Sequence, residues 1–266
     1  MRLVVKIGGQ AVEDAKGRRA LARQMAEIRR SGHALVVVHG GGKLLTQTLA
    51  RLGIPTEFRA GLRVTNAATR DVALMVLAGI VNKRWVAELQ AAGQRALGIC
   101  GGDAGLVRAR KLTLDSNGHR DADLGFVGRP QKVDTAILET AFREGLVPVV
   151  ASVALGPRGE FLNINADDLA AALAMALKAD RLIYLTESGG VWDSERRLLP
   201  LVKVGEIRGL IQRGVVRDGM IPKLLSSART LRHNVREIGI LPSQAPNVLR
   251  RALAGKEAVG TRIVKH

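Results

Sequence analysis

The sequence is poor in cysteine and in aromatic residues. Of its 266 residues, 1 is cysteine and 3% are Phe, Trp or Tyr. Because Cys100 is the only thiol, an intrachain disulfide and a cysteine-based metal site are both excluded. So few aromatic side chains also argue against a surface that binds nucleic acid by stacking on its bases. We therefore expect a core of Leu, Val, Ile and Ala, with Cys100 buried in it.

Long apolar runs and targeting segments are absent as well. No stretch reaches the roughly 20 apolar residues that a membrane-spanning helix needs. Met1 and Arg2 lead directly into a strand pattern that contains Lys6, and such a beginning is unlike a secretory signal. We therefore expect a soluble, cytoplasmic protein with no membrane partner.

Acidic residues are scarce relative to basic ones. The chain has 41 Lys and Arg against 24 Asp and Glu, and its formal net charge is +17. Such an excess is typical of proteins that bind nucleic acid, acidic partners or anionic substrates. The cations are dispersed in pairs such as Arg18-Arg19 and Arg250-Arg251, without the block of about five to eight that marks a nucleic-acid tail. We favour solvated helix faces and expect no nucleic-acid partner.

Strand and helix patterns alternate along most of the chain, which predicts an α/β fold with a mostly parallel sheet covered on both faces. Apolar runs predict strands at 3–7, 34–38, 96–99, 147–151 and 181–185. Helical periodicity predicts helices at 18–31, 43–52, 67–92, 134–144 and 166–179.

Two further features divide this pattern. The polar segment 106–130, with the turn signal Asp115-Ser116-Asn117-Gly118, predicts a β-hairpin beside the sheet. After residue 179 the elements become shorter, so we expect an N-terminal lobe of residues 1–179 and a C-terminal lobe of residues 180–266.

Glycine-rich turns follow the first two predicted strands. Gly8 and Gly9 follow the first strand, which contains Lys6, and Gly41 and Gly42 follow the second. Glycine lets the backbone approach an anion, so the N–H groups of such turns can face phosphate or carboxylate oxygens. A lysine inside an apolar strand costs stability unless an anion neutralises it. The two turns therefore predict a site for a highly charged ligand at the carboxyl ends of the strands.

Other polar residues precede predicted helices. Arg63 lies in a glycine-flanked loop, where a guanidinium can bind a carboxylate through two hydrogen bonds. Asn163, Asn165 and Asp167 alternate before an Ala- and Leu-rich helix, so an extended backbone projects them to one side. Asn165 or Asp167 can instead cap that helix, but capping accounts for one polar residue and not for three.

A last cluster combines the end of the strand 181–185 with a later turn. It comprises Thr186, Glu187, Gly190, Gly219, Met220 and Lys223, and it suits the phosphates or ribose of a nucleotide. The chain has no G-x-x-x-x-G-K-[ST], no G-x-G-x-x-G after its first strand, and no Ser–His or Cys–His nucleophile pattern. His39 lies beside the glycines, and we expect it to hydrogen-bond to the turn and steady it.

Taken together, these residues resemble the amino acid kinase family, and within it the branch that acts on N-acetyl-L-glutamate. The matching segments run in the family's order along the whole chain: VKIGG, VVHGGGK, AGLRVT, LGFVG, LNINAD, DGMIPK and GTRI. The resemblance implies a three-layer αβα sandwich with a central, mainly parallel sheet. It also implies a homodimer formed by the N-terminal lobe, and ATP bound by the C-terminal lobe.

The resemblance implies a reaction and a set of roles. The γ-phosphoryl group of ATP, with Mg²⁺ held mainly by the nucleotide, passes to the side-chain carboxylate of N-acetyl-L-glutamate in arginine biosynthesis. The catalytic residues implied are Lys6, Lys223 and Asp167. The substrate side comprises Gly41, Gly42, Arg63, Asn163 and Asn165. The ATP side comprises Gly8, Gly9, Thr186, Glu187, Gly190, Gly219 and Met220.

Three expectations qualify this assignment. Family members usually have Asp where this chain has Glu187, and the extra methylene could loosen the arrangement of the lysines. The +17 charge also fits a related kinase whose aminoadipate or glutamate is carried on an acidic protein, or a non-catalytic basic binding protein. Arginine-inhibited members have an extra N-terminal helix, whereas the first strand here begins near Arg2, so we expect a dimer that arginine does not inhibit.

Overall fold

The computed structural model describes residues 1–9, 14–59, 61–112, 124–216, 219–255 and 259–266. Within these ranges the protein is an α/β structure built on one eight-stranded sheet. None of the helices described there combines the length and apolar character that crossing a membrane requires.

All five strands predicted from apolar runs are confirmed, and they lie side by side in the sheet. They are β1 (Arg2–Ile7), β2 (Ala34–His39), β5 (Ala96–Cys100), β8 (Val147–Ala151) and β11 (Arg181–Thr186). Their order is β11-β1-β2-β8-β5, and every pair is parallel. Most of their side chains are buried, which explains why they read as continuous apolar runs.

The sheet continues through three strands of the C-terminal part that the sequence patterns did not predict. Beyond β11 follow β15 (Glu237–Pro242), β16 (Thr261–Val264) and β14 (Leu201–Lys203). Strand β16 runs antiparallel to β15, whereas the other neighbouring strands of this sheet are parallel, so the sheet is mainly parallel. Because β1 pairs with β11, a single sheet runs through both predicted lobes.

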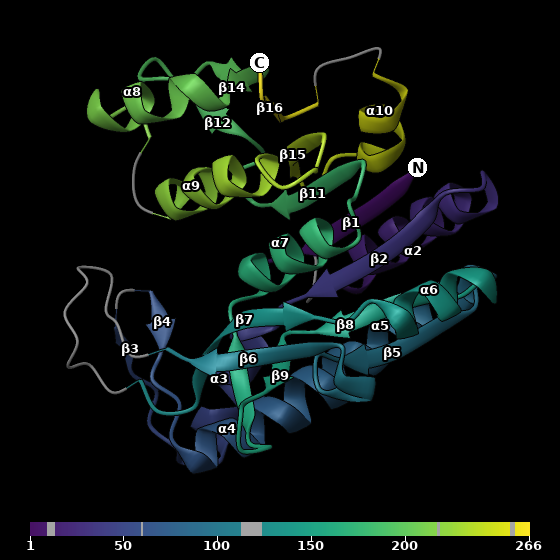
Figure 1. Cartoon of the computed structure of the whole chain (residues 1–266), viewed down its shortest axis with the longest axis vertical. Coiled ribbons are helices and arrows are strands. Elements are labelled where there is room, and N and C mark those ends of the chain that lie inside the picture. Colours follow the sequence, from purple (N-terminus) through teal and green to yellow (C-terminus); the bar gives the residue numbers. More distant parts are fainter. Residues whose placement is uncertain (10–13, 60, 113–123, 217–218, 256–258) are drawn as a thin grey trace.

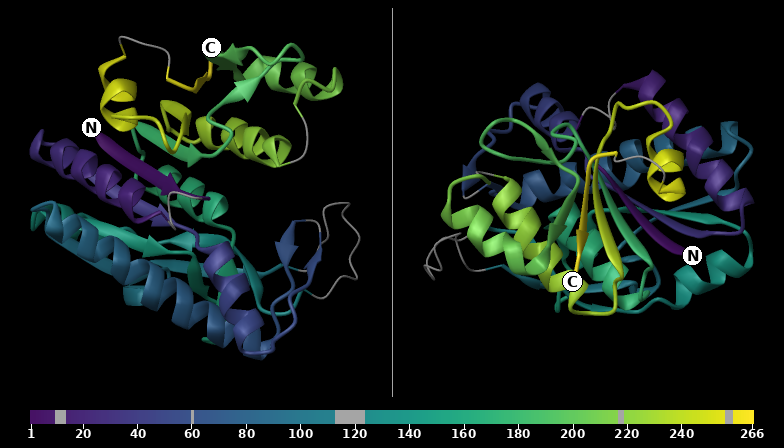
Figure 2. Two further views of the ribbon diagram at one scale, coloured as in Figure 1. Left: turned by 180° about the vertical axis from the view of Figure 1, so that it is seen from behind. Right: turned by 90° about the horizontal axis from the view of Figure 1, so that it is seen from above.

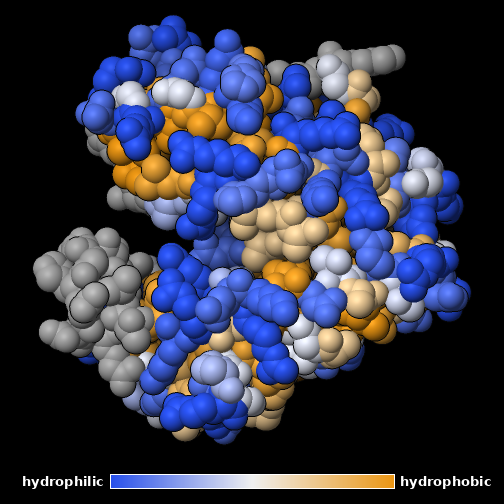
Figure 3. Space-filling view, in the orientation of Figure 1, coloured by the Kyte–Doolittle hydropathy of each residue, from blue (hydrophilic) through white to orange (hydrophobic). Residues whose placement is uncertain are grey.

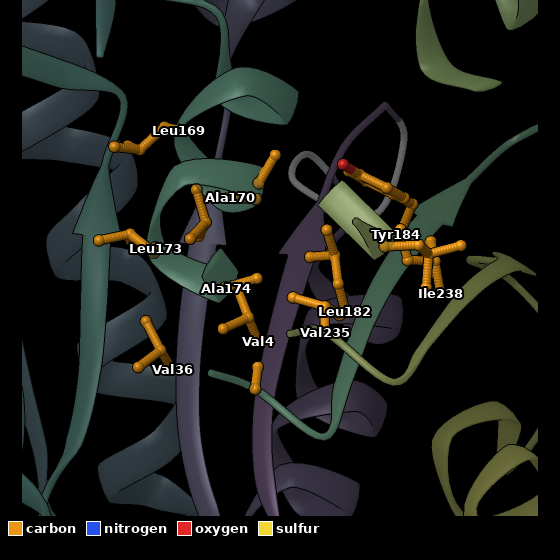
Figure 4. Packing of buried hydrophobic residues seen from close by; sticks show 14 of the residues in the cluster. Val4, Val36, Leu169, Ala170, Leu173, Ala174, Leu182, Tyr184, Val235 and Ile238 are labelled. Carbon is orange, nitrogen blue, oxygen red and sulfur yellow. The ribbon is translucent and has the colours of Figure 1, made fainter. Parts of the chain in front are cut away.

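Helices cover both faces of the sheet (Figure 1 and Figure 2). One face packs against α2 (Ala15–Arg30), α5 (Asn82–Ala91) and α10 (Val248–Ala254); the other packs against α6 (Ala136–Arg143), α7 (Ala166–Ala176) and α9 (Met220–Leu231). Alternate residues of β1 serve the two cores, with Val5 in one and Val4 in the other. Figure 4 shows the core that contains Val4 and α7. The predicted three-layer sandwich is thus confirmed.

The predicted long helix 67–92 is continuous but changes its winding. It comprises α4 (Ala67–Ala73), a π-helical segment η1 (Leu74–Val81) and α5. The side chain of Asn66 caps its start, accepting a hydrogen bond of 2.8 Å from the Thr69 N–H. Gly93 follows its end with a φ of +79°, a value that favours glycine.

The predicted hairpin is confirmed as β6 (Val107–Lys111) and β7 (Val127–Val133), while its turn signal at 115–118 lies outside the described residues. These strands form a small closed barrel with β9 (Val153–Leu155) and β10 (Phe161–Ile164).

The remaining elements are α3 (Gly42–Arg51), α8 (Ile207–Gln212), β3 (Phe58–Arg59), β4 (Leu62–Arg63), β12 (Val191–Trp192), β13 (Leu198–Leu199), and 3₁₀ turns at Asp103–Gly105 and Val204–Glu206.

Candidate active site

The predicted site residues gather at one edge of the sheet, where the parallel strands β2, β1 and β11 end side by side. Strand β1 lies between two neighbours: β2, which follows it in the sequence, and β11, which comes from the C-terminal part. Open α/β sheets bind ligands at such a switch in strand order. The surface is hollowed on the side where β3 and β4 face α9 (Figure 3).

Two lysines meet on one carboxylate at this edge. Lys6 of β1 lies on the sheet face covered by α7, and its Nζ is 2.8 Å from Oδ1 of Asp167 in the first turn of α7. The Nζ of Lys223, in the first turn of α9, donates a hydrogen bond to Oδ2 of the same carboxylate. Three residues far apart in the sequence therefore form one cluster.

The cluster carries a net positive charge in a largely desolvated place. The side chains of Lys6, Asp167 and Lys223 are only 14%, 24% and 12% exposed. Burial alone raises the pKa of the Asp167 carboxyl, but the charges and hydrogen bonds of both lysines outweigh it and hold that pKa below its usual value. Burial lowers the pKa of the Lys223 ammonium, and Asp167 opposes this effect. Two cations on one anion leave positive charge for an anionic ligand.

The first glycine turn lies against this cluster. A Cβ atom on Gly8 would come within 2.5 Å of Lys6 Nζ, so only glycine leaves the ammonium in place. Gly9 has a φ of +58°, and a Cβ there would lie 2.5 Å from Oε1 of Glu187. Glu187, at the position where the resemblance predicts an aspartate, therefore reaches the backbone of this turn. The turn forms a cradle that a larger residue would fill.

The second glycine turn leads into α3. Gly41 has a φ of +153°, and a Cβ there would come within 2.9 Å of Leu77, so both the conformation and the space require glycine. No side chain caps α3, which begins at Gly42. Its first N–H groups are thus available to an anion.

A pocket of about 190 Å³ lies beside this turn, and it brings together every residue predicted for the substrate side: Gly41, Gly42, Arg63, Asn163 and Asn165. Apolar side chains complete its wall, among them Leu45, Leu77 and Val127. A small ligand with anionic ends and a short apolar chain suits such a lining.

Arg63 is the cation of this pocket, and the residue is only 7% exposed. Its guanidinium donates to Thr46 Oγ1 at 2.8 Å and to the Gly42 carbonyl at 3.2 Å, and it stacks 4.6 Å from the centre of the Phe58 ring. Burial lowers its pKa, and no carboxylate pairs with it among the residues that the structure describes. A buried cation held by neutral groups favours an anionic ligand.

The two asparagines differ in their surroundings. Asn165 is the N-cap of α7, and its Oδ1 accepts hydrogen bonds from the N–H groups of Asp167 and Asp168 at 2.8 and 3.2 Å. The capping alternative is therefore confirmed for Asn165. Asn163 lines the pocket, with its Nδ2 3.4 Å from Thr65 Oγ1.

His39 steadies the second turn, as predicted. It is fully buried; its Nδ1 contacts the Gly40 carbonyl at 2.8 Å, and its Nε2 contacts Asn82 Nδ2 at 3.2 Å. Because Asn82 Nδ2 is a donor, Nε2 accepts and Nδ1–H donates. Burial lowers the pKa of the imidazole to about 4, so it is neutral at pH 7. Asn82 escaped the sequence analysis because it lies in the middle of a helix, far along the chain.

Of the residues predicted for the nucleotide side, Gly8 and Gly9 follow β1. The others lie at or after the end of β11 (Thr186, Glu187 and Gly190) or at the start of α9 (Gly219 and Met220). Thr186 ends β11, and its Oγ1 accepts a hydrogen bond of 3.1 Å from the Gly189 N–H. Gly219 is the N-cap of α9, and Met220 begins the helix that carries Lys223. The described residues contain no group of three or more His, Cys, Asp and Glu side chains that could hold a metal ion.

Comparison with known sequences places the chain among kinases. The profile of the amino acid kinase family matches residues 1–241. A protein of Acidobacterium capsulatum named acetylglutamate kinase is 43% identical over 264 residues, or 99% of each chain. A Koribacter versatilis protein of the same name is 44% identical over 99% of each chain. A third, from Methylobacterium nodulans, is 40% identical over 98% of this chain and 88% of its own.

Solved structures agree on the fold. N-acetylglutamate synthase from Neisseria gonorrhoeae, complexed with coenzyme A and N-acetyl-glutamate, matches all of this chain with a TM-score of 0.87 and 25% identity, and the match spans 59% of that protein. A Streptococcus mutans protein matches with a TM-score of 0.81 and 28% identity over 100% and 99% of the two chains. Carbamate kinase from Giardia lamblia shares the fold at 18% identity, with a TM-score of 0.69.

Proposed function

This chain belongs to the amino acid kinase family, and we propose that it transfers the γ-phosphoryl group of ATP to the side-chain carboxylate of N-acetyl-L-glutamate. The product is N-acetyl-L-glutamyl 5-phosphate, an intermediate of arginine biosynthesis. The observation that carries the proposal is the placement of the Lys6–Asp167–Lys223 cluster at the strand ends, next to a pocket that contains the buried guanidinium of Arg63. Among the described residues no carboxylate neutralises that guanidinium. The names of the relatives support the same substrate.

The reaction needs charge neutralisation more than proton transfer. A substrate carboxylate with a pKa of about 4.3 is ionised at neutral pH, so no general base is required. One of its oxygens attacks the γ-phosphorus, the bond from that phosphorus to the β,γ-bridging oxygen breaks, and ADP leaves with the electron pair. Lys6 and Lys223 stabilise the charge on the transferring group, while Asp167 holds both ammoniums in position.

N-Acetyl-L-glutamate occupies the pocket in this proposal. Arg63 binds its α-carboxylate through charge-assisted hydrogen bonds. The groups that hold Arg63 in the structure, Thr46 and the Gly42 carbonyl, are neutral, so they do not cancel the positive charge of the guanidinium. Asn163 contacts the substrate, the N–H groups at Gly41 and Gly42 face the reacting oxygens, and Asn165 supports Asp167 from the pocket wall. In this proposal the distance between the two carboxylates discriminates against aspartate, whose chain is shorter, and glutamate is disfavoured because its free ammonium group would bring a positive charge near Arg63.

ATP lies along the first glycine turn and the ends of β11 and α9, in contact with Gly8, Gly9, Thr186, Glu187, Gly190, Gly219 and Met220. The cradle at Gly8 and the excess positive charge of the lysine pair suit its phosphates. Both oxygens of Asp167 are already engaged by lysines, so the phosphates themselves are the better ligands for Mg²⁺. When bound there, Mg²⁺ supplies further positive charge at the β- and γ-phosphates.

We further propose that residues 1–179 form the substrate-binding lobe and residues 180–266 the ATP-binding lobe of a cytoplasmic homodimer. Met75 and Ile80 on η1 are 57% and 42% exposed, and burial of such apolar side chains favours association of two copies through this helix. Light scattering checks this point, and a dimer that arginine leaves unchanged is the expected result.

The test is an ATP- and Mg²⁺-dependent acyl-phosphate assay that traps the product with hydroxylamine. We expect product from N-acetyl-L-glutamate, and little from glutamate, aspartate or N-acetyl-aminoadipate. Arg63→Met serves as the matched variant, since it removes the guanidinium but keeps a long side chain; a large rise in KM for N-acetylglutamate is expected. Absence of product from every free amino acid would contradict the proposal and favour a carrier-bound substrate or a non-catalytic protein.

A further inference from the structure

Tyr184 is a buried aromatic residue directly beside the lysine pair. It is fully buried on β11, and it is the register partner of Lys6 across the parallel pairing of β1 with β11. Register partners in a sheet point to the same face, so the Tyr184 ring and the Lys6 side chain both lie under α7. Figure 4 shows Tyr184 in the core with its neighbours Leu182 and Ile238.

The face of this ring contacts the second lysine. Lys223 Nζ lies 4.7 Å from the centre of the Tyr184 ring, within the range of a cation–π interaction. The same ammonium donates a hydrogen bond to Asp167. The nitrogen is thus held between a carboxylate and an aromatic face, and both are themselves largely buried.

Lys223 contacts the ring in addition to the carboxylate that it shares with Lys6. Lys6 extends from near the end of β1, a strand paired on both sides, and Lys223 extends from the first turn of α9. The two ammoniums share one carboxylate, so they repel each other, and a further favourable contact helps to hold Lys223 in place. Burial also lowers the pKa of the Lys223 ammonium, and a contact that favours the charged form opposes this effect.

We propose that Tyr184 is a positioning residue for phosphoryl transfer, whose ring face holds the Lys223 ammonium on Asp167 where it meets the transferring group. The proposal rests on the kinase function argued above. It assigns the effect to the ring and none to the hydroxyl. Burial, with Asp167 and Asp168 nearby, raises the pKa of that hydroxyl well above 10, so it neither accepts nor supplies a proton in the reaction.

The first test compares Tyr184→Phe, which keeps the ring, with Tyr184→Leu, which keeps apolar bulk without it. Tyr184→Phe is expected to retain kcat within about twofold. Tyr184→Leu is expected to lose about tenfold in kcat, in line with the loss of a desolvated cation–π contact. KM for N-acetylglutamate is expected to stay unchanged in both, because the Arg63 pocket is untouched. Full kcat in a folded Tyr184→Leu variant would overturn the proposal.

The second test does not depend on activity. Protein labelled with ¹³C at the lysine ε-carbons is studied by NMR, and the Lys223 resonance is assigned from its loss in Lys223→Arg. A ring-current upfield shift is expected in the wild type and in Tyr184→Phe, and its loss is expected in Tyr184→Leu. Leu182→Val, on the same face of β11, is the matched control and is expected to keep the shift.

The two tests separate the failure of this inference from failure of the proposed function. A wild type without kinase activity would contradict the function, and the NMR shift would still decide whether the ring holds Lys223. A Lys223 resonance that is identical in the wild type and Tyr184→Leu would refute the positioning role, even if Tyr184→Leu were less active.

Discussion

Asn165 holds Asp167 in place through the backbone: its side-chain Oδ1 accepts a hydrogen bond of 2.8 Å from the Asp167 N–H and thereby caps α7. Since the Asp167 carboxylate contacts both Lys6 and Lys223, one helix cap supports the whole charged cluster. The start of α7 therefore combines a stabilising role with the catalytic role proposed for Asp167.

Replacing this cap is expected to affect stability and turnover together. Asn165→Ala leaves the first N–H groups of α7 without a partner and is expected to lower the free energy of unfolding by about 1 kcal/mol. We expect kcat to fall as Asp167 loses its support. Urea denaturation and steady-state kinetics measure both effects, and Asn165→Asp, which keeps a capping oxygen, is the control. Equal stability of Asn165→Ala and the wild type would refute the capping role.

Removing either lysine is expected to abolish most of the activity. Lys6→Ala and Lys223→Ala each delete a preorganised cation, and turnover is expected to fall by about 10²–10³-fold. The acyl-phosphate assay measures this loss. Lys203→Ala, at an exposed lysine on β14, controls for a general effect of charge. Wild-type turnover in either cluster variant would disprove its catalytic assignment.

His39 makes stability depend on pH. Burial lowers the pKa of its imidazole to about 4 in the folded protein, against 6.5 for an unperturbed histidine. Above pH 6.5 both states are neutral and the contribution is complete. As the pH falls from 6.5 to about 4, the unfolded chain binds a proton that the folded protein excludes, so about 3 kcal/mol of stability is lost.

The measurement is chemical denaturation at several pH values between 7 and 4. His39→Gln keeps a donor and an acceptor at this position but cannot titrate, so its stability is expected to fall less steeply with acid. Parallel pH dependence of the variant and the wild type would show that other groups are responsible.

Two like charges lie opposite each other in the barrel. Arg110 of β6 and Arg129 of β7 are directly paired in the antiparallel ladder. Arg110→Glu turns this repulsion into attraction and is expected to raise the free energy of unfolding by about 0.2–1 kcal/mol. Arg110→Gln separates lost repulsion from gained attraction. A gain that persists unchanged in about 1 M salt would argue against an electrostatic cause.

The sequence by itself determined the parallel centre of the sheet and the residue types at its edge. Apolar runs such as 34–38 and glycine turns such as 40–42 are local signals, because both faces of a parallel strand are buried and a tight turn needs glycine. For the same reason Lys6, Arg63, Asn163 and Asp167 stood out as polar residues in structured surroundings.

Only the tertiary structure decided how these residues meet. The extension of the sheet by β14, β15 and β16 and the closure of the barrel depend on pairings between distant segments, which short apolar patterns cannot specify. The same holds for Tyr184, which reads in sequence as one more core residue. Its role depends on α9 bringing Lys223 over its ring, and such a contact is set by packing between layers and leaves no local trace in the chain.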